Sequence, residues 1–208
     1  MKPHIVLLNG TSSAGKTSIA GWVQNLSPDG YLMTGWDHMA QALPLRVNRV
    51  SNDTDAPSGH PWFEWVMSTT RPGLADFRVG PLARTLMETM HRASAELVRN
   101  GISVLIDDVL FDPEVVRSTV EIFADVPVWF VGVRCPVEVA ELREAARGDR
   151  MVGLARVLYP VVHTFGPYDI EVDTSQLTAK EGAEIVLREI GSGATPSALA
   201  RVRVGAER

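Results

Sequence analysis

Short apolar runs alternate along this chain with segments whose apolar residues recur at helical spacing. The runs are rich in Val and Ile and predict buried strands at residues 4–9, 31–35, 102–107, 127–133 and 168–172. The clearest helical segment follows Pro81 and ends at Asn100-Gly101, a glycine stop. This alternation is typical of a parallel sheet covered by helices on both faces. We therefore predict a three-layer α/β fold with a five-stranded parallel sheet.

Capping residues mark the start of two further helices. Asp112-Pro113-Glu114 combines an N-cap, a proline at the first helical position and an acid that complements the helix dipole. Thr178 and Glu181 have the spacing of a capping box.

The segment from Leu45 to Gly80 interrupts the alternation. It has little periodicity and many Gly, Pro, Asn and Asp residues, so we expect a long functional loop. It also contains four aromatic residues, Trp62, Phe63, Trp65 and Phe77. They either line a pocket for a small molecule or form a satellite hydrophobic cluster that holds the loop to the body.

Composition limits the classes of partner. The chain has 208 residues, 45% of them hydrophobic, and a formal net charge of −5 with acidic and basic residues interspersed. This predicts one domain and argues against a nucleic-acid partner. No apolar stretch has the length of a membrane span, and the single cysteine, Cys135, follows an apolar run, as a buried thiol in a reducing compartment would. We expect a cytoplasmic protein.

The run from Gly10 to Thr17 matches the phosphate-binding pattern G-x-x-x-x-G-K-[ST] at every fixed position. It follows the apolar run at 4–9 and precedes a helical face, so its context favours this interpretation over a Gly/Ser-rich turn with an incidental lysine. The pattern predicts a P-loop NTPase fold that binds a nucleoside triphosphate and Mg²⁺, with Lys16 on the outer phosphates and Thr17 on the metal, and it does not decide between ATP and GTP. The nucleotide-binding residues predicted here are Gly10, Thr11, Ser12, Ser13, Ala14, Gly15, Lys16, Thr17 and Ser18.

Aspartates follow the carboxyl ends of the predicted strands, where open parallel sheets bind ligands. Asp37 is the candidate for the carboxylate that orients or deprotonates a phosphoryl acceptor, although it could also serve only as a helix N-cap. Asp107 is the candidate for the metal shell, and Asp108 is a candidate to face the acceptor. Asp173 is expected to cap or turn into the last helix.

Three arginines lie beyond the fourth predicted strand. Arg143 and Arg147 are four residues apart on a helix, and Arg150 follows a Gly-Asp turn, so together they could form a lid over the phosphates. The alternative is a solvated helix face on which Glu141 and Glu144 pair with these arginines.

A set of short motifs resembles the chloramphenicol phosphotransferase family of P-loop kinases over about residues 3–190. The matching residues occur in the same order and at similar spacing. They are Leu7-Leu-Asn-Gly-Thr-Ser-Ser-Ala-Gly-Lys16, Gly35-Trp-Asp37, Ile106-Asp-Asp108, Val131-Gly-Val-Arg-Cys135, Ala146-Arg-Gly-Asp-Arg150, Val161-Val-His163 and Tyr168-Asp-Ile-Glu-Val-Asp-Thr174.

The resemblance implies a nucleoside-kinase-like fold that transfers the γ-phosphoryl group of ATP to a hydroxyl of a small molecule, which in the named member is the primary alcohol of chloramphenicol. It further implies that Asp37 is the base, that Lys16 binds phosphate, and that the segment near Arg147 and Arg150 belongs to the nucleotide lid. The resemblance fails mainly in residues 45–80. We therefore expect a kinase domain at 1–190, an insertion at about 45–80 that covers the acceptor, and a flexible tail at 191–208.

Two alternative functions fit the same motifs. One is a metabolic kinase of nucleosides, nucleotides or polyols, and the other is a nucleotide-binding switch or adaptor without small-molecule kinase activity. His163 matches the resemblance but is interpreted either as a packing residue or as a ligand contact.

Overall fold

The computed structural model describes residues 2–52, 59–70, 73–148 and 152–202. Its main sheet contains the five predicted strands, all parallel, in the order β2-β6-β1-β7-β8. Their bounds are Ile5–Asn9 for β1, Tyr31–Gly35 for β2, Ser103–Asp108 for β6, Val128–Arg134 for β7 and Ile170–Asp173 for β8. The predicted three-layer fold is confirmed.

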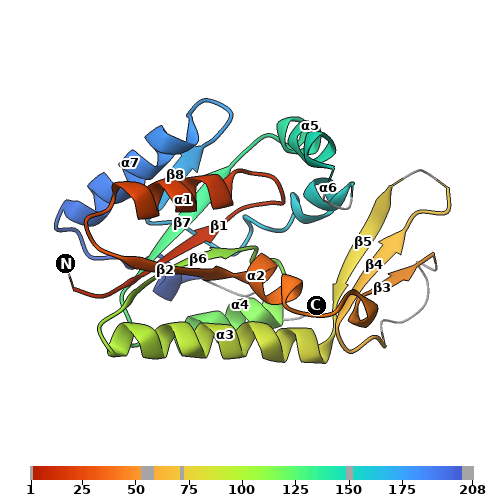
Figure 1. Ribbon diagram of the computed structural model, residues 1–208, viewed down its shortest axis with the longest axis horizontal. Helices are drawn as coiled ribbons and strands as arrows, with labels where there is room; N and C mark the ends of the chain where they lie inside the picture. The colour runs from red at the N-terminus through yellow and green to blue at the C-terminus, as the bar shows by residue number, and fades with distance from the viewer. Residues whose placement is uncertain (1, 53–58, 71–72, 149–151, 203–208) are drawn as a thin grey trace.

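Helices cover both faces of this sheet (Figure 1). Helices α1 (Lys16–Leu26) and α7 (Ala179–Gly191) lie on one face, and α3 (Pro81–Arg99) and α4 (Pro113–Ile122) lie on the other. The central strand β1 is fully buried and alternates between the two sides, with Val6 and Leu8 in one core cluster and Ile5 and Leu7 in the other. Burial on both faces explains why this strand is apolar at consecutive positions.

The predicted helix ends are confirmed. The Asp112 carboxylate accepts hydrogen bonds from the backbone N–H groups of Glu114 and Val115, and Thr178 and Glu181 form a reciprocal capping box. Helix α3 ends at Arg99 with Asn100 as its C-cap, and the following Gly101 has a φ of 93°, which favours glycine.

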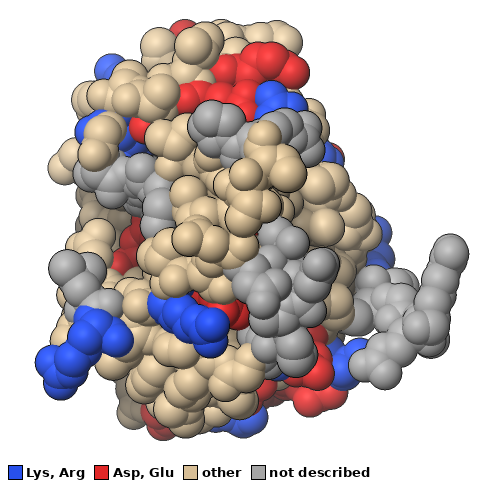
Figure 2. All heavy atoms as spheres, turned by 90° about the vertical axis from the view of Figure 1, so that its right-hand side faces the viewer, with Lys and Arg blue, Asp and Glu red and all other residues tan. Residues whose placement is uncertain are grey.

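The expectation of a long loop at residues 45–80 is wrong. After helix α2 (Trp36–Gln41) and a 3-10 turn at Leu45–Val47, the chain forms a second, three-stranded sheet in the order β3-β4-β5. Its strands are β3 (Arg49–Ser51), β4 (Phe63–Met67) and β5 (Leu74–Val79). Figure 2 faces this end of the molecule and shows mainly uncharged side chains over the middle of the surface, with charged groups of both signs around them.

Aromatic packing stabilises this small sheet. Phe63 of β4 is fully buried, packs edge-to-face on Trp36 at a ring-centroid distance of 4.1 Å and stacks on Phe77 of β5 at 5.9 Å. The satellite cluster that the sequence offered as one interpretation of these aromatics is therefore present.

The C-terminal segment also differs from the expected flexible tail as far as residue 202. Ala198, Leu199 and Val202 are buried in the core cluster on the α3/α4 face. The Asp169 carboxylate accepts hydrogen bonds from the N–H groups of Ser197 and Ala198 and so fixes the entry to a 3-10 turn at Leu199–Arg201. The rest of the predicted tail, 203–208, lies outside the described residues.

Within the described part of the chain, no helix has both the length and the apolar character needed to cross a membrane.

Candidate active site

A cavity of about 910 Å³ lies at the carboxyl ends of the main strands, between the 10–17 loop and the small sheet. We call its two sides the loop half and the aromatic half. The loop half is lined by Ser12, Ser13, Gly15, Lys16, Thr17, Ser18, Asp107, Arg143, Ala146, Arg147, Thr174, Leu177, Thr178 and Ala179. The aromatic half is lined by Trp36, Asp37, Ala40, Asn48, Val50, Trp65, Phe77, Val109, Phe111, Leu154 and Leu158.

The loop between β1 and α1 requires both of its glycines. A Cβ at Gly10 would overlap the carbonyl oxygen of Val133, so a side chain does not fit there. Gly15 caps α1 with a φ of 94°, a left-handed conformation that glycine adopts without strain. The loop therefore leads into the N-terminus of α1, where backbone N–H groups can bind an anion.

Two hydroxyl groups of this loop are buried without a hydrogen-bond partner among the described residues. They are Ser12 Oγ and Ser13 Oγ, and both residues line the cavity. Lys16 is only 7% exposed, and its ammonium group donates hydrogen bonds to the carbonyl oxygens of Gly10 and Thr11 at 2.9 and 3.0 Å. Buried donors and a buried cation next to a helix N-terminus fit a phosphate chain.

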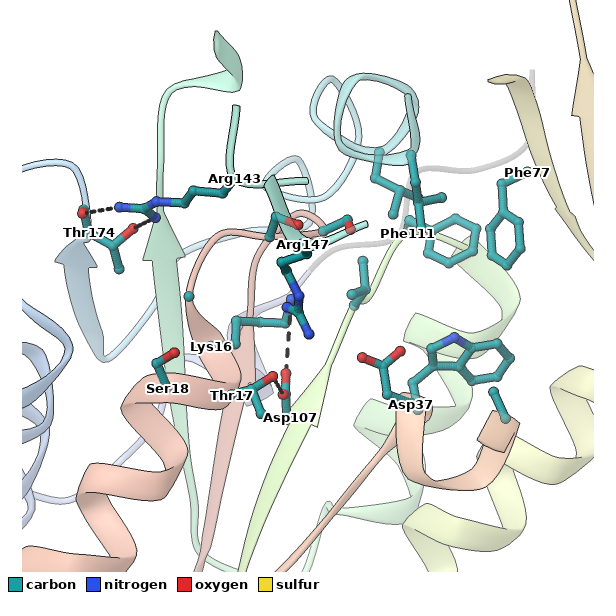
Figure 3. A pocket seen from close by; sticks show the side chains of 18 of the residues that line it. Lys16, Thr17, Ser18, Asp37, Phe77, Asp107, Phe111, Arg143, Arg147 and Thr174 are labelled. Atoms are coloured by element: carbon teal, nitrogen blue, oxygen red, sulfur yellow. Dashed lines mark hydrogen bonds and ion pairs between the residues drawn. The ribbon is translucent and has the colours of Figure 1, made fainter. Parts of the chain in front are cut away.

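The predicted metal ligands meet in the structure. Thr17 Oγ1 donates a hydrogen bond to Asp107 Oδ2, and the Lys16 ammonium lies 3.9 Å from Asp107 Oδ1 (Figure 3). Burial raises the pKa of Asp107, and the nearby Lys16 cation and the Thr17 hydroxyl oppose that shift. A hydroxyl beside a buried carboxylate is an oxygen donor set that suits Mg²⁺.

The expectation that Asp108 could face an acceptor is wrong. Asp108 is completely buried on the opposite side of β6, where its carboxylate is 2.8 Å from His91 Nε2 and accepts a hydrogen bond from the Val109 N–H. Successive side chains of a strand point to opposite faces, so Asp107 and Asp108 cannot share one site.

Asp37 lies on the other side of the cavity from Lys16. It is the second residue of α2, whose N-cap is Gly35, so the alternative in which Asp37 is only an N-cap does not hold. Figure 3 shows its carboxylate pointing into the space between the loop and the aromatic side chains. A group that emerges there from the aromatic half would meet both Asp37 and a phosphate held by the loop.

Helix α5 (Val137–Arg147) brings two of the three predicted arginines to the loop half. Arg143 donates to the Thr174 hydroxyl at 2.9 Å and to the Thr174 carbonyl oxygen at 2.7 Å, and Arg147 also lines the cavity. Arg150 lies outside the described residues. The alternative, in which these arginines pair with Glu141 and Glu144, is wrong. Glu141 pairs with Arg156 instead, and Glu144 is buried.

Two residues that hold the loop in place stand in the matching motifs, but the sequence assigns them no role. The Asn9 amide donates to the Val162 carbonyl oxygen and accepts from the Leu110 N–H, which ties β1 to two other segments. Thr174 Oγ1 donates to the Ala14 carbonyl oxygen at 2.7 Å. Their positions at the carboxyl ends of β1 and just after β8 are the signal that would have found them.

His163 does not line this cavity. It lies beside a separate pocket of about 290 Å³, and its Nδ1 shares a hydrogen bond of 2.7 Å with the Tyr168 hydroxyl. Burial, and then the nearby Arg134 cation, lower the pKa of His163 to about 4. Cys135 is a buried free thiol, as predicted.

A family model described as chloramphenicol phosphotransferase-like protein matches residues 3–190. The chain belongs to this family. It is 32% identical over 204 residues to MT2714 and Rv2636, proposed O-phosphotransferases from two strains of Mycobacterium tuberculosis, with 96% of this chain and 87% of each relative covered. The protein is thus a P-loop phosphotransferase with an oxygen acceptor.

Solved structures share the fold at low sequence identity. APS kinase CysC of Mycobacterium tuberculosis, in complex with AMPPNP and APS, matches with a TM-score of 0.62 at 14% identity, covering 91% of this chain and 98% of that one. A tunicamycin resistance protein of Deinococcus radiodurans matches with a TM-score of 0.51 at 19% identity, covering 90% of this chain and 96% of that one. These similarities show the fold alone.

Proposed function

We propose that this phosphotransferase moves the γ-phosphoryl group of ATP to a hydroxyl of chloramphenicol or of a similar uncharged small molecule. The observation that carries the proposal is the division of the cavity into two chemically different halves. Within the described residues, the basic side chains that line it are Lys16, Arg143 and Arg147, all in the loop half.

The loop half fits a triphosphate. The α1 N-terminus and the Ser12 and Ser13 hydroxyls provide donors, and Lys16, Arg143 and Arg147 provide the positive charge that a polyphosphate requires. Thr17 and Asp107 are the side chains that would hold Mg²⁺, which when bound neutralises part of the phosphate charge.

The aromatic half fits an uncharged acceptor with apolar surface. Trp65, Phe77 and Phe111 form much of its wall, and Asp37 is the charged side chain that the described residues contribute there. An anionic acceptor such as a sugar acid or a nucleotide would bring its charge next to aromatic rings and a carboxylate. This arrangement favours chloramphenicol over the acceptors of the metabolic kinases that the same motifs fit.

In the proposed reaction, Asp37 accepts a hydrogen bond from the acceptor hydroxyl and takes its proton. The hydroxyl oxygen forms a bond to the γ-phosphorus, the bond from that phosphorus to the β,γ-bridging oxygen breaks, and ADP leaves. Lys16 and the arginines stabilise the charge on the transferring group.

A panel of acceptors incubated with γ-labelled ATP tests the proposal. The panel contains chloramphenicol, a nucleoside, a nucleotide, gluconate and a polyol, and the expected result is label on chloramphenicol. Label confined to a nucleoside, nucleotide, sugar acid or polyol would refute the proposed acceptor. Nucleotide binding without transfer to any compound would favour a switch.

A further inference from the structure

The short helix α6 (Leu154–Leu158) connects three parts of the molecule. Thr11 Oγ1 of the 10–17 loop donates to the Ala155 carbonyl oxygen at 2.8 Å, and just before the helix the Val152 carbonyl oxygen accepts a hydrogen bond from the Leu74 N–H of β5 at 3.2 Å. Figure 1 shows α6 next to α5, on the side that faces the small sheet. Leu158 is buried in the same cluster as Phe63 and Phe77, so α6 forms one wall of the aromatic half.

A buried carboxylate holds the start of this helix. Glu144 of α5 is 1% exposed; its Oε2 accepts a hydrogen bond from the Gly153 N–H at 2.7 Å and its Oε1 accepts one from the Ala155 N–H at 3.1 Å. No ion pair of Glu144 occurs among the residues that the structure describes. A buried carboxylate is costly unless its oxygens are hydrogen-bonded, and here both oxygens are used by the backbone of α6.

Glu144 sits between the two arginines of the loop half in the sequence of α5. Arg143 and Arg147 line the loop half, whereas Leu154 and Leu158 of α6 line the aromatic half. The two hydrogen bonds of Glu144 therefore join the element that carries the arginines to the element that forms the acceptor wall.

We infer that Glu144 is a positioning residue that fixes α6, and through α6 the small sheet, relative to the arginine-bearing helix α5. Its role is to set the distance between the bound acceptor and the phosphate chain, because a small misplacement of reacting groups lowers the rate of transfer. The kinetic part of this inference rests on the proposed function, whereas the structural part does not.

The chain offers a matched control on the same two helices. Glu141 of α5 pairs with Arg156 of α6 at the surface, where the side chains are 30% and 63% exposed. Exposed ion pairs contribute little to stability, so Glu141→Gln should leave α6 in place. Both substitutions remove a contact between α5 and α6, but only Glu144→Gln removes the buried carboxylate. An effect that occurs in Glu144→Gln and not in Glu141→Gln is therefore due to the buried carboxylate.

Hydrogen exchange measured by mass spectrometry on the full chain tests the structural part. The Glu144→Gln change replaces one acceptor oxygen by an N–H₂ group that faces a backbone N–H, so it should speed exchange in peptides covering 74–79 and 152–158 by about tenfold. Peptides covering β1 should exchange as in the wild type, and so should all peptides of Glu141→Gln. Unchanged exchange at 74–79 and 152–158 would overturn the inference.

Steady-state kinetics and calorimetry test the functional part with chloramphenicol and Mg-ATP as probes. Glu144→Gln should reduce kcat/KM for chloramphenicol by roughly tenfold, while its Kd for Mg-ATP stays within about twofold of the wild-type value. If the affinity for Mg-ATP falls by the same factor as kcat/KM for chloramphenicol, the substitution destabilises the protein generally, and the positioning role is overturned.

Two further outcomes remain decisive. If the wild type transfers phosphate to no acceptor of the panel, the proposed function fails and hydrogen exchange alone decides the role of Glu144. If Glu144→Gln does not yield folded protein, Thr11→Val is the second variant, because it removes the hydrogen bond from the 10–17 loop to the Ala155 carbonyl oxygen. If α6 connects the loop to the small sheet, Thr11→Val should give the same exchange pattern. Exchange at 74–79 that is unchanged in Thr11→Val would overturn the inference.

Discussion

In the loop half of the cavity, residues 12–18 form one continuous segment to which β6, α5, the segment after β8 and α7 add side chains. The aromatic half has no such segment and takes its lining from α2, the three strands of the small sheet, the segment after β6, and α6. We expect the loop half to bind its ligand largely through backbone N–H groups, in conformations that only a few residue types allow. We expect the aromatic half to bind through the shape of its side chains. One half therefore has a local signature in the sequence and the other has none.

Because of this difference, the two halves give different information about function. The phosphate-binding pattern of the loop occurs in many phosphate-binding proteins, so under the proposed function the loop half marks the phosphoryl donor and not the acceptor. The aromatic half and Asp37 are proposed to face the acceptor, and the information about the substrate would lie there.

The largest effect is expected from the loop half. Lys16→Met removes the buried cation beside the phosphate site and should lower kcat by roughly 10³-fold, as measured with γ-labelled ATP and chloramphenicol. Lys180→Met is the control, because Lys180 is exposed on α7 and pairs with Glu184. Turnover that survives in Lys16→Met would show that the loop is not the phosphate site.

A smaller and more selective effect is expected from the aromatic half. Trp65→Ala removes part of the acceptor wall and should raise KM for chloramphenicol by roughly 10- to 100-fold without changing the Kd for Mg-ATP. Trp62→Ala is the control on the neighbouring segment, since Trp62 packs on the same cluster but does not line the cavity. Equal changes in both variants would mean that the sheet acts only through its stability.

The smallest effect concerns a residue outside both halves. The pKa of His163 is about 4 in the folded protein and 6.5 in an unfolded chain, so the unfolded state binds more protons between these values. Stability contributed by the neutral ring is therefore lost as the pH falls from 6.5 toward 4. Between pH 6.5 and pH 4, the free energy of unfolding should fall by about 1 to 2 kcal/mol less in His163→Gln than in the wild type. This figure allows for solvent screening of the exposed part of the ring.

Unfolding by urea at several pH values measures this difference in pH dependence, and His38→Gln, on the exposed α2 surface, is the control. An identical pH dependence in the wild type and His163→Gln would contradict the lowered pKa. Unchanged phosphotransfer by His163→Gln at neutral pH is also expected, because His163 does not line the cavity.

Much of the fold could be predicted from the sequence because its signals are local. Buried parallel strands are continuous apolar runs, and the Asp112 and Thr178 caps use side chains within three residues of the backbone groups that they bind. The small sheet escaped prediction because β3 has only three residues and the links between its strands are rich in Gly, Pro and Asp. Its stability comes from Phe63, which packs on Trp36 and on Phe77 from other segments of the chain.

The residues of the site likewise divide into those with a local sequence signal and those that only the tertiary structure reveals. Lys16, Thr17 and Asp107 follow from a motif and a strand end, and the structure brings them together. Glu144 could not be recognised, because a glutamate in a charged helix is typical of a solvated face and only the position of α6 shows that it is buried. Asp108 was misassigned because the sequence does not show which face of β6 each aspartate occupies.

In the proposed reaction, the loop binds the nucleotide while Asp37, from across the cavity, activates the acceptor. The most direct test measures Mg-ATP affinity by calorimetry and phosphotransfer by product labelling in Asp37→Asn, with Asp29→Asn, at the other end of β2, as the control. We predict a Kd within about twofold of the wild-type value and a rate lower by roughly 10² to 10⁴-fold for Asp37→Asn. Unchanged turnover, or loss of nucleotide binding along with turnover, would contradict the account.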